Sequence, residues 1–230
     1  MPTKVPNLSN ISKVTCGENH SLALSKDGVV YGWGRNSSLQ LSHEREFLAV
    51  VNPLLAIYSP LRINKNLESA IATDIAAGQE HSIIVTKNKN NGETEVFGCG
   101  KNNVGQLAFG AQTRPIDVIK IDSLSNYKIT TPEGVKKDLT IDQIQCGDNH
   151  CLAVLSTGFA LEWGDNHYGQ LGNQLSGFKD KPIIISDFKN DKIISISAKH
   201  RNSAVVAEYD PKQEERLAEE RRKKREARRQ

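Results

Sequence analysis

Short apolar runs alternate with polar turns along most of the chain, and the runs have the length of β-strands. Residues 20–24 (HSLAL), 81–85 (HSIIV) and 150–154 (HCLAV) each begin with a histidine and continue as an apolar run suited to a buried strand. A polar turn such as SKDG or STG follows, and then a second run that ends in glycine. The pattern predicts short strands joined by turns.

The second runs lead into turns rich in glycine and asparagine, where a positive φ is tolerated. The runs are VVYGWG, EVFGCG and ALEWG, and the turns are RNSSLQL, KNNVGQL and DNHYGQL. Further strands are expected near residues 59–63, 115–121 and 181–186. Four strands in each unit indicate a repeating blade rather than a helical hairpin.

The units keep a regular internal spacing. The histidine precedes the residue before the final glycine of the second run by 13 residues in the first and third units and by 18 in the second, where the polar loop NKNNGETE is longer. These pairs are His20 and Trp33, His81 and Cys99, and His150 and Trp163. Residues 198–210 look like the start of a fourth unit. The chain therefore holds three full units and two strands of a fourth, about fourteen strands.

The repeated residues resemble the regulator of chromosome condensation family, in which a G-x-x-H-S/T motif precedes a W-G-x-N-x-x-G-Q-L-G motif. The resemblance covers roughly residues 11–208 and implies a β-propeller, which in that family closes as a ring of seven blades. The repeat positions that carry it are Gly17, His20, Trp33, Gly34, Gly78, His81, Gly100, Gln106, Gly147, His150, Trp163, Gly164 and Gln170.

We therefore expect an all-β fold, a partial or small β-propeller of about three and a half four-stranded blades, with a C-terminal charged α-helix. The first copy ends in Leu39-Gln40-Leu41-Ser42 instead of G-Q-L-G, which predicts a distorted turn there. The expected units are about 11–70, 71–140, 141–190 and an incomplete 191–210, within a propeller region of 1–210 that precedes a helical tail of 211–230.

A half ring leaves unpaired strand edges, which invite pairing with another chain. The chain could close as a ring of four blades, dimerise into one ring, or complete its sheet against a partner in a larger assembly, and the third arrangement is favoured. Long connectors at residues 42–70 and 108–140 are candidate contact regions, since binding residues concentrate on loops. The apolar candidates for partner contact are Phe47, Leu54, Leu55 and Tyr58.

The cysteine, histidine and serine residues that could suggest a metal or catalytic site are better explained as positions of the repeat. Cys146, His150, Cys151 and His167 are of the types that bind zinc. However, the histidine recurs in every unit without a cysteine beside it in the other two. Serine follows it there, but neighbouring side chains of a strand point to opposite faces and no oriented acid accompanies them. The glycine-rich segments do not match a phosphate-binding loop. We expect no catalytic, metal or cofactor residues.

The basic charge of the chain is concentrated in its tail. The formal net charge is +3, and residues 212–230 alone hold nine Lys or Arg and five Asp or Glu. Their order suits a helix dipole. A solvated helix, a nuclear-import signal and a helix that docks on an acidic surface (a microtubule, RNA or DNA) remain open. The candidate docking residues are Arg221, Arg222, Lys223, Lys224 and Arg225.

These observations favour a non-enzymatic protein-interaction scaffold, a subunit docked in a larger assembly that is cytoskeletal or ciliary. The resemblance also implies an alternative, nucleotide exchange on a small GTPase, since the founding family member is an exchange factor and chromatin binder. Binding of chromatin or nucleic acid through the tail is a further alternative. We expect no membrane span, a cytoplasmic location with a nuclear alternative, and free thiols at the four cysteines.

Overall fold

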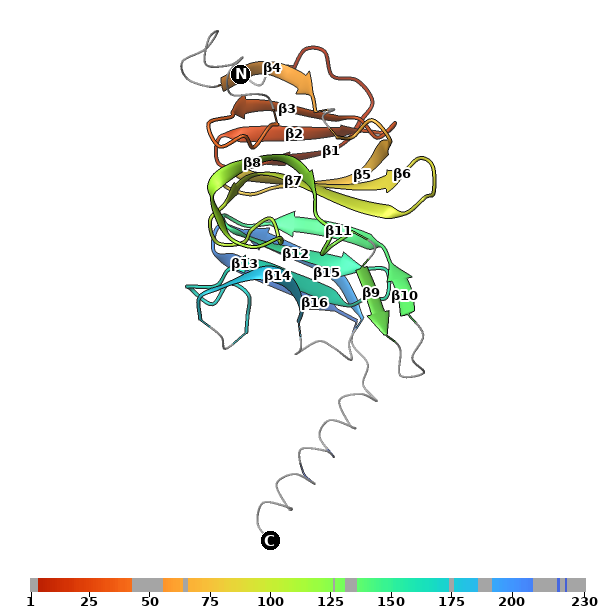
Figure 1. Cartoon of the computed structure of the whole chain (residues 1–230), viewed down its shortest axis with the longest axis vertical. Helices are drawn as coiled ribbons and strands as arrows, with labels where there is room; N and C mark the ends of the chain where they lie inside the picture. The colour runs from red at the N-terminus through yellow and green to blue at the C-terminus, as the bar shows by residue number, and fades with distance from the viewer. Residues whose placement is uncertain are drawn as a thin grey trace.

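The computed structural model describes residues 4–42, 56–63, 66–125, 127–130, 136–173, 176–185 and 192–208, together with Glu219 and Arg222. Figure 1 shows the strands gathered into antiparallel sheets that follow one another like the blades of a propeller. Among the described residues, three sheets have four strands each and two have two strands each, and one of these two-stranded sheets forms the fourth blade. The predicted all-β fold of about three and a half blades is confirmed.

Each blade is a meander in which strands that are neighbours in sequence are neighbours in the sheet. The first blade contains β1 (Ile11–Cys16), β2 (His20–Ser25), β3 (Val30–Arg35) and β4 (Ala56–Arg62). The second contains β5 (Ala70–Ala77), β6 (His81–Asn88), β7 (Thr94–Asn102) and β8 (Gln112–Lys120). The third contains β11 (Ile141–Cys146), β12 (His150–Leu155), β13 (Ala160–Asp165) and β14 (Phe178–Ile184), and the fourth contains β15 (Ile193–Lys199) and β16 (Asn202–Ala207).

A separate hairpin of β9 (Tyr127–Thr130) and β10 (Lys136–Leu139) lies in the connector between the second and third blades. From the sequence, this connector is expected only as a long loop. Its two strands are four residues each, and neither has the continuous apolar run that marks the second strand of each full blade.

The core consists of apolar layers between successive blades. The first strands β1, β5, β11 and β15 lie side by side from blade to blade. The second strands β6 and β12 are buried along most of their length because they lie inside their sheets and between blades. The layer between the third and fourth blades is smaller than the two before it. Burial of these layers supplies the main driving force for stacking the blades.

Main-chain hydrogen bonds fix the position of each blade on the next. The amide of Glu18 donates to the carbonyl of Gln79 at 3.3 Å, the amide of Gln79 to Asp148 at 2.9 Å, and the amide of Asp148 to His200 at 2.7 Å. All four residues follow the first strand of their blade. The repeated bond means that one geometry is copied at every interface.

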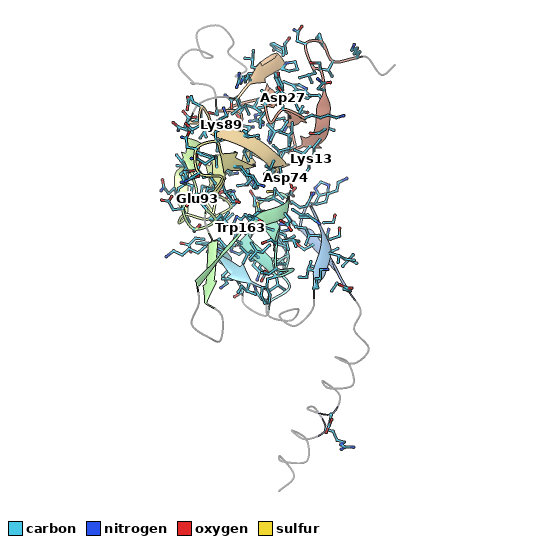
Figure 2. The ribbon with its side chains drawn as sticks, turned by 90° about the vertical axis from the view of Figure 1, so that its right-hand side faces the viewer. Lys13, Asp27, Asp74, Lys89, Glu93 and Trp163 are labelled. Atoms are coloured by element: carbon cyan, nitrogen blue, oxygen red, sulfur yellow. The ribbon has the colours of Figure 1, made fainter. Side chains whose placement is uncertain are left out.

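Asp74 of β5 connects three blades. Its carboxylate forms an ion pair with Lys13 of β1, and Figure 2 shows the two side chains pointing toward each other. The same carboxylate accepts a hydrogen bond from the amide of Ile144 in β11 at 3.1 Å. Hydrogen bonds to a charged acceptor are stronger than neutral ones, so Asp74 reinforces the stacking order.

The turn of the first copy is regular, so the predicted distortion is wrong. The amide of Leu41 donates to Asn36 Oδ1 at 2.8 Å, and the equivalent bonds of the other two copies measure 2.9 Å each. Leu39 and Ser42 adopt φ values of 60° and 58°, the left-handed conformation that glycine supplies more easily. The asparagine side chain holds the turn and compensates for the absent glycines.

Several candidate contact residues lie outside the described residues, namely Phe47, Leu54, Leu55, Arg221, Lys223, Lys224 and Arg225. Tyr58 lies in β4 with 76% of its surface exposed. In the tail, Glu219 and Arg222 are described, and both are helical and exposed. The helix as a whole and the contact roles stay predictions. Within the described residues, no helix has the length and apolar character needed to cross a bilayer.

Candidate protein-interaction site

The repeated histidine of each blade bonds to the blade that follows. In every case Nε2 contacts the residue that comes directly after the histidine position in the next second strand. The pairs are His20 with Ser82 Oγ at 3.0 Å, His81 with Cys151 Sγ at 3.2 Å, and His150 with Ser203 Oγ at 2.9 Å. The sequence signalled both partners, since serine or cysteine recurs after the histidine, but not that they pair between blades.

Burial keeps these imidazoles neutral. Desolvation lowers the pKa of His20 to about 4 and that of His81 to about 3, and it also lowers the pKa of His150. The repeat glycine before each ring leaves room for it: a Cβ at Gly78 would lie 1.9 Å from the ring of His81. Each histidine therefore acts as a neutral hydrogen-bonding link between blades.

The main-chain carbonyl of the G-Q-L turn is the second inter-blade acceptor. In the first blade, the carbonyl of Gln40 accepts from Ser82 Oγ at 2.7 Å and from Cys99 Sγ at 3.3 Å. In the second blade, the carbonyl of Gln106 accepts from the indole N–H of Trp163 at 3.0 Å. In both cases the third strand of the following blade carries a donor into the interface.

The burial of each tryptophan depends on whether another blade precedes its own. Trp163 of the third blade is fully buried, whereas Trp33 of the first blade is half-buried. Both residues occupy the same position of the third strand, opposite Cys151 and Ser21 respectively. The difference arises because Trp163 packs against the blade before it, while no blade precedes Trp33 in the described structure.

The glycine after this position, at Gly34, Gly100 and Gly164, is required by the backbone. Its φ lies between +96° and +105°, and a Cβ there would lie 2.4–2.5 Å from a carbonyl oxygen of the preceding turn. Residues other than glycine rarely adopt such a conformation. The Trp-Gly pair thus has two separate physical causes, an inter-blade hydrogen bond and a close backbone approach.

The fourth blade lacks a third strand among the described residues, and an open cleft lies at that position. Its volume is about 350 Å³. Its lining includes Leu152 of β12, Gln170 and Leu171 of the third G-Q-L turn, Ile185 directly after β14, and Ser203 and Val205 of β16. This cleft is equivalent to the places that Cys99 and Trp163 fill in the two earlier interfaces.

The four residues that could suggest a zinc site from the sequence, Cys146, His150, Cys151 and His167, do not form one cluster in the structure. His150 contacts Ser203, and His167 contacts Asp165 at 2.5 Å, so neither faces the two cysteines. Among the described residues, one group of three has ligand atoms within 4.8 Å of each other, His81, Cys146 and Cys151. Burial raises the pKa of Cys151 well above its usual range, so the thiol is protonated. Within this group, the neutral imidazole of His81 forms a hydrogen bond with the protonated thiol of Cys151.

Four-stranded blades joined by these contacts define a repeat β-propeller. The chain belongs to the regulator of chromosome condensation (RCC1) repeat family, whose repeat model matches residues 27–85, 93–154 and 158–206. A second model of the same repeat matches residues 11–40, 72–106 and 141–170.

Known proteins of greater length contain similar segments. The chain is 35% identical over 186 residues to human "Probable E3 ubiquitin-protein ligase HERC6", an alignment that covers 80% of this chain and 16% of HERC6. Human WBSCR16 superimposes with a TM-score of 0.65 and 20% identity, over 86% of this chain and 45% of that protein. Prp20p of Saccharomyces cerevisiae, whose structure is described with its binding to Gsp1p and histones, superimposes with a TM-score of 0.62 and 21% identity, over 94% of this chain and 48% of Prp20p.

Proposed function

We propose that the chain is a non-enzymatic protein-interaction module, a propeller subunit that docks in a larger assembly through its open blade edge. One observation carries the proposal. β16 is the second strand of its blade, yet it pairs only with β15 among the described residues. In the three full blades the second strand lies between two strands.

Burial shows what the open edge exposes. The second strand of the third blade is buried at every residue, whereas residues 202–204 of β16 are exposed and Val206 is 54% exposed. An exposed edge with unpaired N–H and C=O groups pairs readily with another strand. Apolar side chains beside such an edge add a hydrophobic contribution to the docking.

The opposite end of the stack offers a second contact surface. In the first blade, Val14 is 64% exposed and Cys16 is exposed. Ser21 occupies the position at which Ser82 and Ser203 bond to a histidine of the preceding blade. A partner on this face that presents a hydrogen-bonding side chain to Ser21 would continue the repeat.

The setting that we propose is a cytoplasmic assembly, cytoskeletal or ciliary, in which the basic tail contacts an acidic surface. Nine basic residues between positions 212 and 230 support this contact, since such clusters attract microtubule, RNA or DNA surfaces. Deleting the tail is expected to reduce binding to such a surface and to reduce its salt dependence.

The native size of the chain tests the proposed function. The tagged full chain in an extract of its source organism should elute well above its mass of 25.4 kDa, with partner proteins cross-linked to β16 or to the first blade. The purified chain provides the reference elution. A chain that elutes from the extract as a monomer, without cross-linked proteins, contradicts the proposal.

A second candidate is binding to a small GTPase or to histones. Family membership favours it, together with the described binding of Prp20p to Gsp1p and histones. Accelerated release of labelled GDP from one member of a GTPase panel would support the first part. Nucleosome binding that is lost on removal of residues 212–230 would support the second.

A further inference from the structure

We propose that the open edge of β16 accepts a strand of a partner protein with the pattern apolar–any–Trp–Gly. The strand pairs antiparallel to β16, and its indole fills the cleft beside Gln170. This inference rests on the proposed function and specifies the chemistry of the partner. It follows from the internal copies of the same interface, which show what occupies each equivalent cleft.

The strand register of the three complete blades gives the position of the tryptophan in the docked strand. In the sheets, Trp33 lies opposite Ser21, and Trp163 lies opposite Cys151. Ser203 holds the corresponding position in the fourth blade, because it pairs with Ala198 as Cys151 pairs with Cys146. A third strand in this blade therefore places its tryptophan position opposite Ser203.

The apolar residue of the pattern lies two positions earlier. Tyr31, Phe97 and Leu161 occupy this place in the three full blades. Phe97 and Leu161 are buried against the preceding blade at 5% and 0% exposure. In the fourth blade the residue opposite this place is Val205, which is half-buried and lines the cleft.

The glycine of the pattern meets the turn that carries Arg201. In the third blade, Gly164 approaches the carbonyl oxygen of Asn149, and the amide of Asp165 donates to that oxygen at 2.9 Å. The first and second blades repeat this bond at 2.7 and 2.9 Å. The carbonyl of Arg201 holds the equivalent position, so a docked strand needs glycine beside it and an amide after it.

The cleft has the polarity that an indole requires. Leu152 and Leu171 line it as Ile83 and Leu107 line the site of Trp163. The Gln170 carbonyl is the copy of the acceptor that bonds the Trp163 indole at 3.0 Å. Among the described residues no donor reaches this carbonyl. An aromatic ring with one N–H donor satisfies both features.

The edge of β16 also offers main-chain groups to a partner. The amide of Glu208 donates to the carbonyl of Lys192, on the side of β15. Because N–H and C=O groups alternate sides along an antiparallel strand, the groups of Ser203, Val205 and Ala207 point away from β15. A docked strand can form the same ladder that β12 forms with β13.

The chain does not carry the pattern in a segment that is free to dock. Its two tryptophans already lie in β3 and β13. Residues 209–230 contain neither tryptophan nor glycine. A folded second copy has its tryptophans in the same two strands. Residues 1–230 therefore hold no third Trp-Gly pair, and the proposal places the docked strand in a partner protein.

A peptide with the sequence of residues 159–166, FALEWGDN, is a direct probe, because it is the chain's own third strand. Labelled peptide is titrated with the full chain, and binding is followed by fluorescence anisotropy. Replacing its tryptophan by alanine should weaken binding by about 10-fold or more. Replacing it by phenylalanine, which keeps a ring but removes the N–H donor, should weaken binding by roughly 5-fold.

Two variants of β16 form a matched pair. Val205→Lys places a charge in the cleft and should abolish peptide binding. Val206→Lys changes the neighbouring residue, which is 54% exposed on the other face of the strand, and should bind like the parent chain. Thermal unfolding of both variants, followed by circular dichroism, shows whether each remains folded. Equal binding by the two variants would overturn the proposal.

The remaining outcomes are equally decisive. Absence of binding up to about 1 mM peptide, or equal binding of the tryptophan and alanine peptides, overturns the assignment of the strand. Self-association that Val205→Lys abolishes would assign the edge to a second copy and also overturn it. If the peptide fails while the chain still elutes in a large complex, only this inference is wrong. If the peptide binds while the chain is monomeric in the extract, only the proposed function is wrong.

Discussion

Acidification is expected to destabilise the stack of blades through its three inter-blade histidines. His20 and His81 have pKa values of about 4 and 3 in the folded chain, and the pKa of His150 is also lowered. In the unfolded chain a histidine titrates near 6.5. Below that pH the unfolded chain binds more protons, so the free energy of unfolding falls until the pH reaches the folded pKa.

The magnitude follows from the pKa values of His20 and His81. Between pH 7 and pH 5, each of His20 and His81 lowers the free energy of unfolding by about 2 kcal/mol, and together by about 4 kcal/mol. His150 adds to the loss in the same direction. Since small domains are stable by only about 5–15 kcal/mol, this is a large fraction of the total.

Urea unfolding at pH 7 and pH 5 measures this difference, with tryptophan fluorescence as the signal because Trp163 is fully buried. The midpoint should fall by roughly 1 M or more at the lower pH. His81→Asn should reduce the pH dependence by about 2 kcal/mol, whatever it does to the stability at pH 7. Asparagine is a natural choice because Asn202 occupies the histidine position of the fourth blade.

His200→Asn is the matched control, since that side chain is 73% exposed. It removes an imidazole from the surface instead of one that is buried between two blades. The reasoning is refuted if the parent chain has the same unfolding midpoint at both pH values. It is also refuted if His81→Asn and His200→Asn change the pH dependence equally, because carboxylates would then cause the acid effect.

Substitutions at three further repeat positions, Cys151, Gly164 and Trp163, test the repeated contacts by urea unfolding followed with circular dichroism. Cys151→Ala should lower the free energy of unfolding by about 1–3 kcal/mol because it leaves the buried Nε2 of His81 unpaired, while Cys151→Ser should cost under about 1 kcal/mol. Gly164→Ala should cost more than about 2 kcal/mol, since its Cβ would lie 2.4 Å from a carbonyl oxygen, whereas Gly169→Ala, with nothing within 4 Å, should cost about 1 kcal/mol. Trp163→Phe should cost about 2–3 kcal/mol because it removes a buried hydrogen bond and leaves a small cavity.

The blades could be predicted from the sequence because each is built from local signals. A short apolar run, a polar turn and a glycine after Trp33, Cys99 and Trp163 recur at fixed spacing, and each signal acts within one sheet. The contacts between blades could not be predicted in the same way. His81 and Cys151 are 70 positions apart, and their pairing depends on how one sheet lies on the next.

The turn of the first copy shows where local reasoning fails. Its lack of glycine predicted a distortion, yet Leu39 and Ser42 adopt the left-handed conformation that glycine favours. The side chain of Asn36 bonds the amide of Leu41 and outweighs the modest cost of that conformation. An asparagine in the turn was therefore a stronger signal than the glycines around it.

The open edge of β16 is defined by the sequence and the structure together. The sequence shows that the Trp-Gly pattern follows two of the histidine units, is reduced to Cys99-Gly100 in a third and has no copy after Ser203. The structure shows that this pattern fills a defined cleft and meets a defined carbonyl in the interface before it. In a protein whose interfaces are copies of one another, a filled interface specifies the chemistry of an open one. For this reason the carbonyl of Gln170 and the edge of β16 specify the proposed partner strand more narrowly than their exposure alone would.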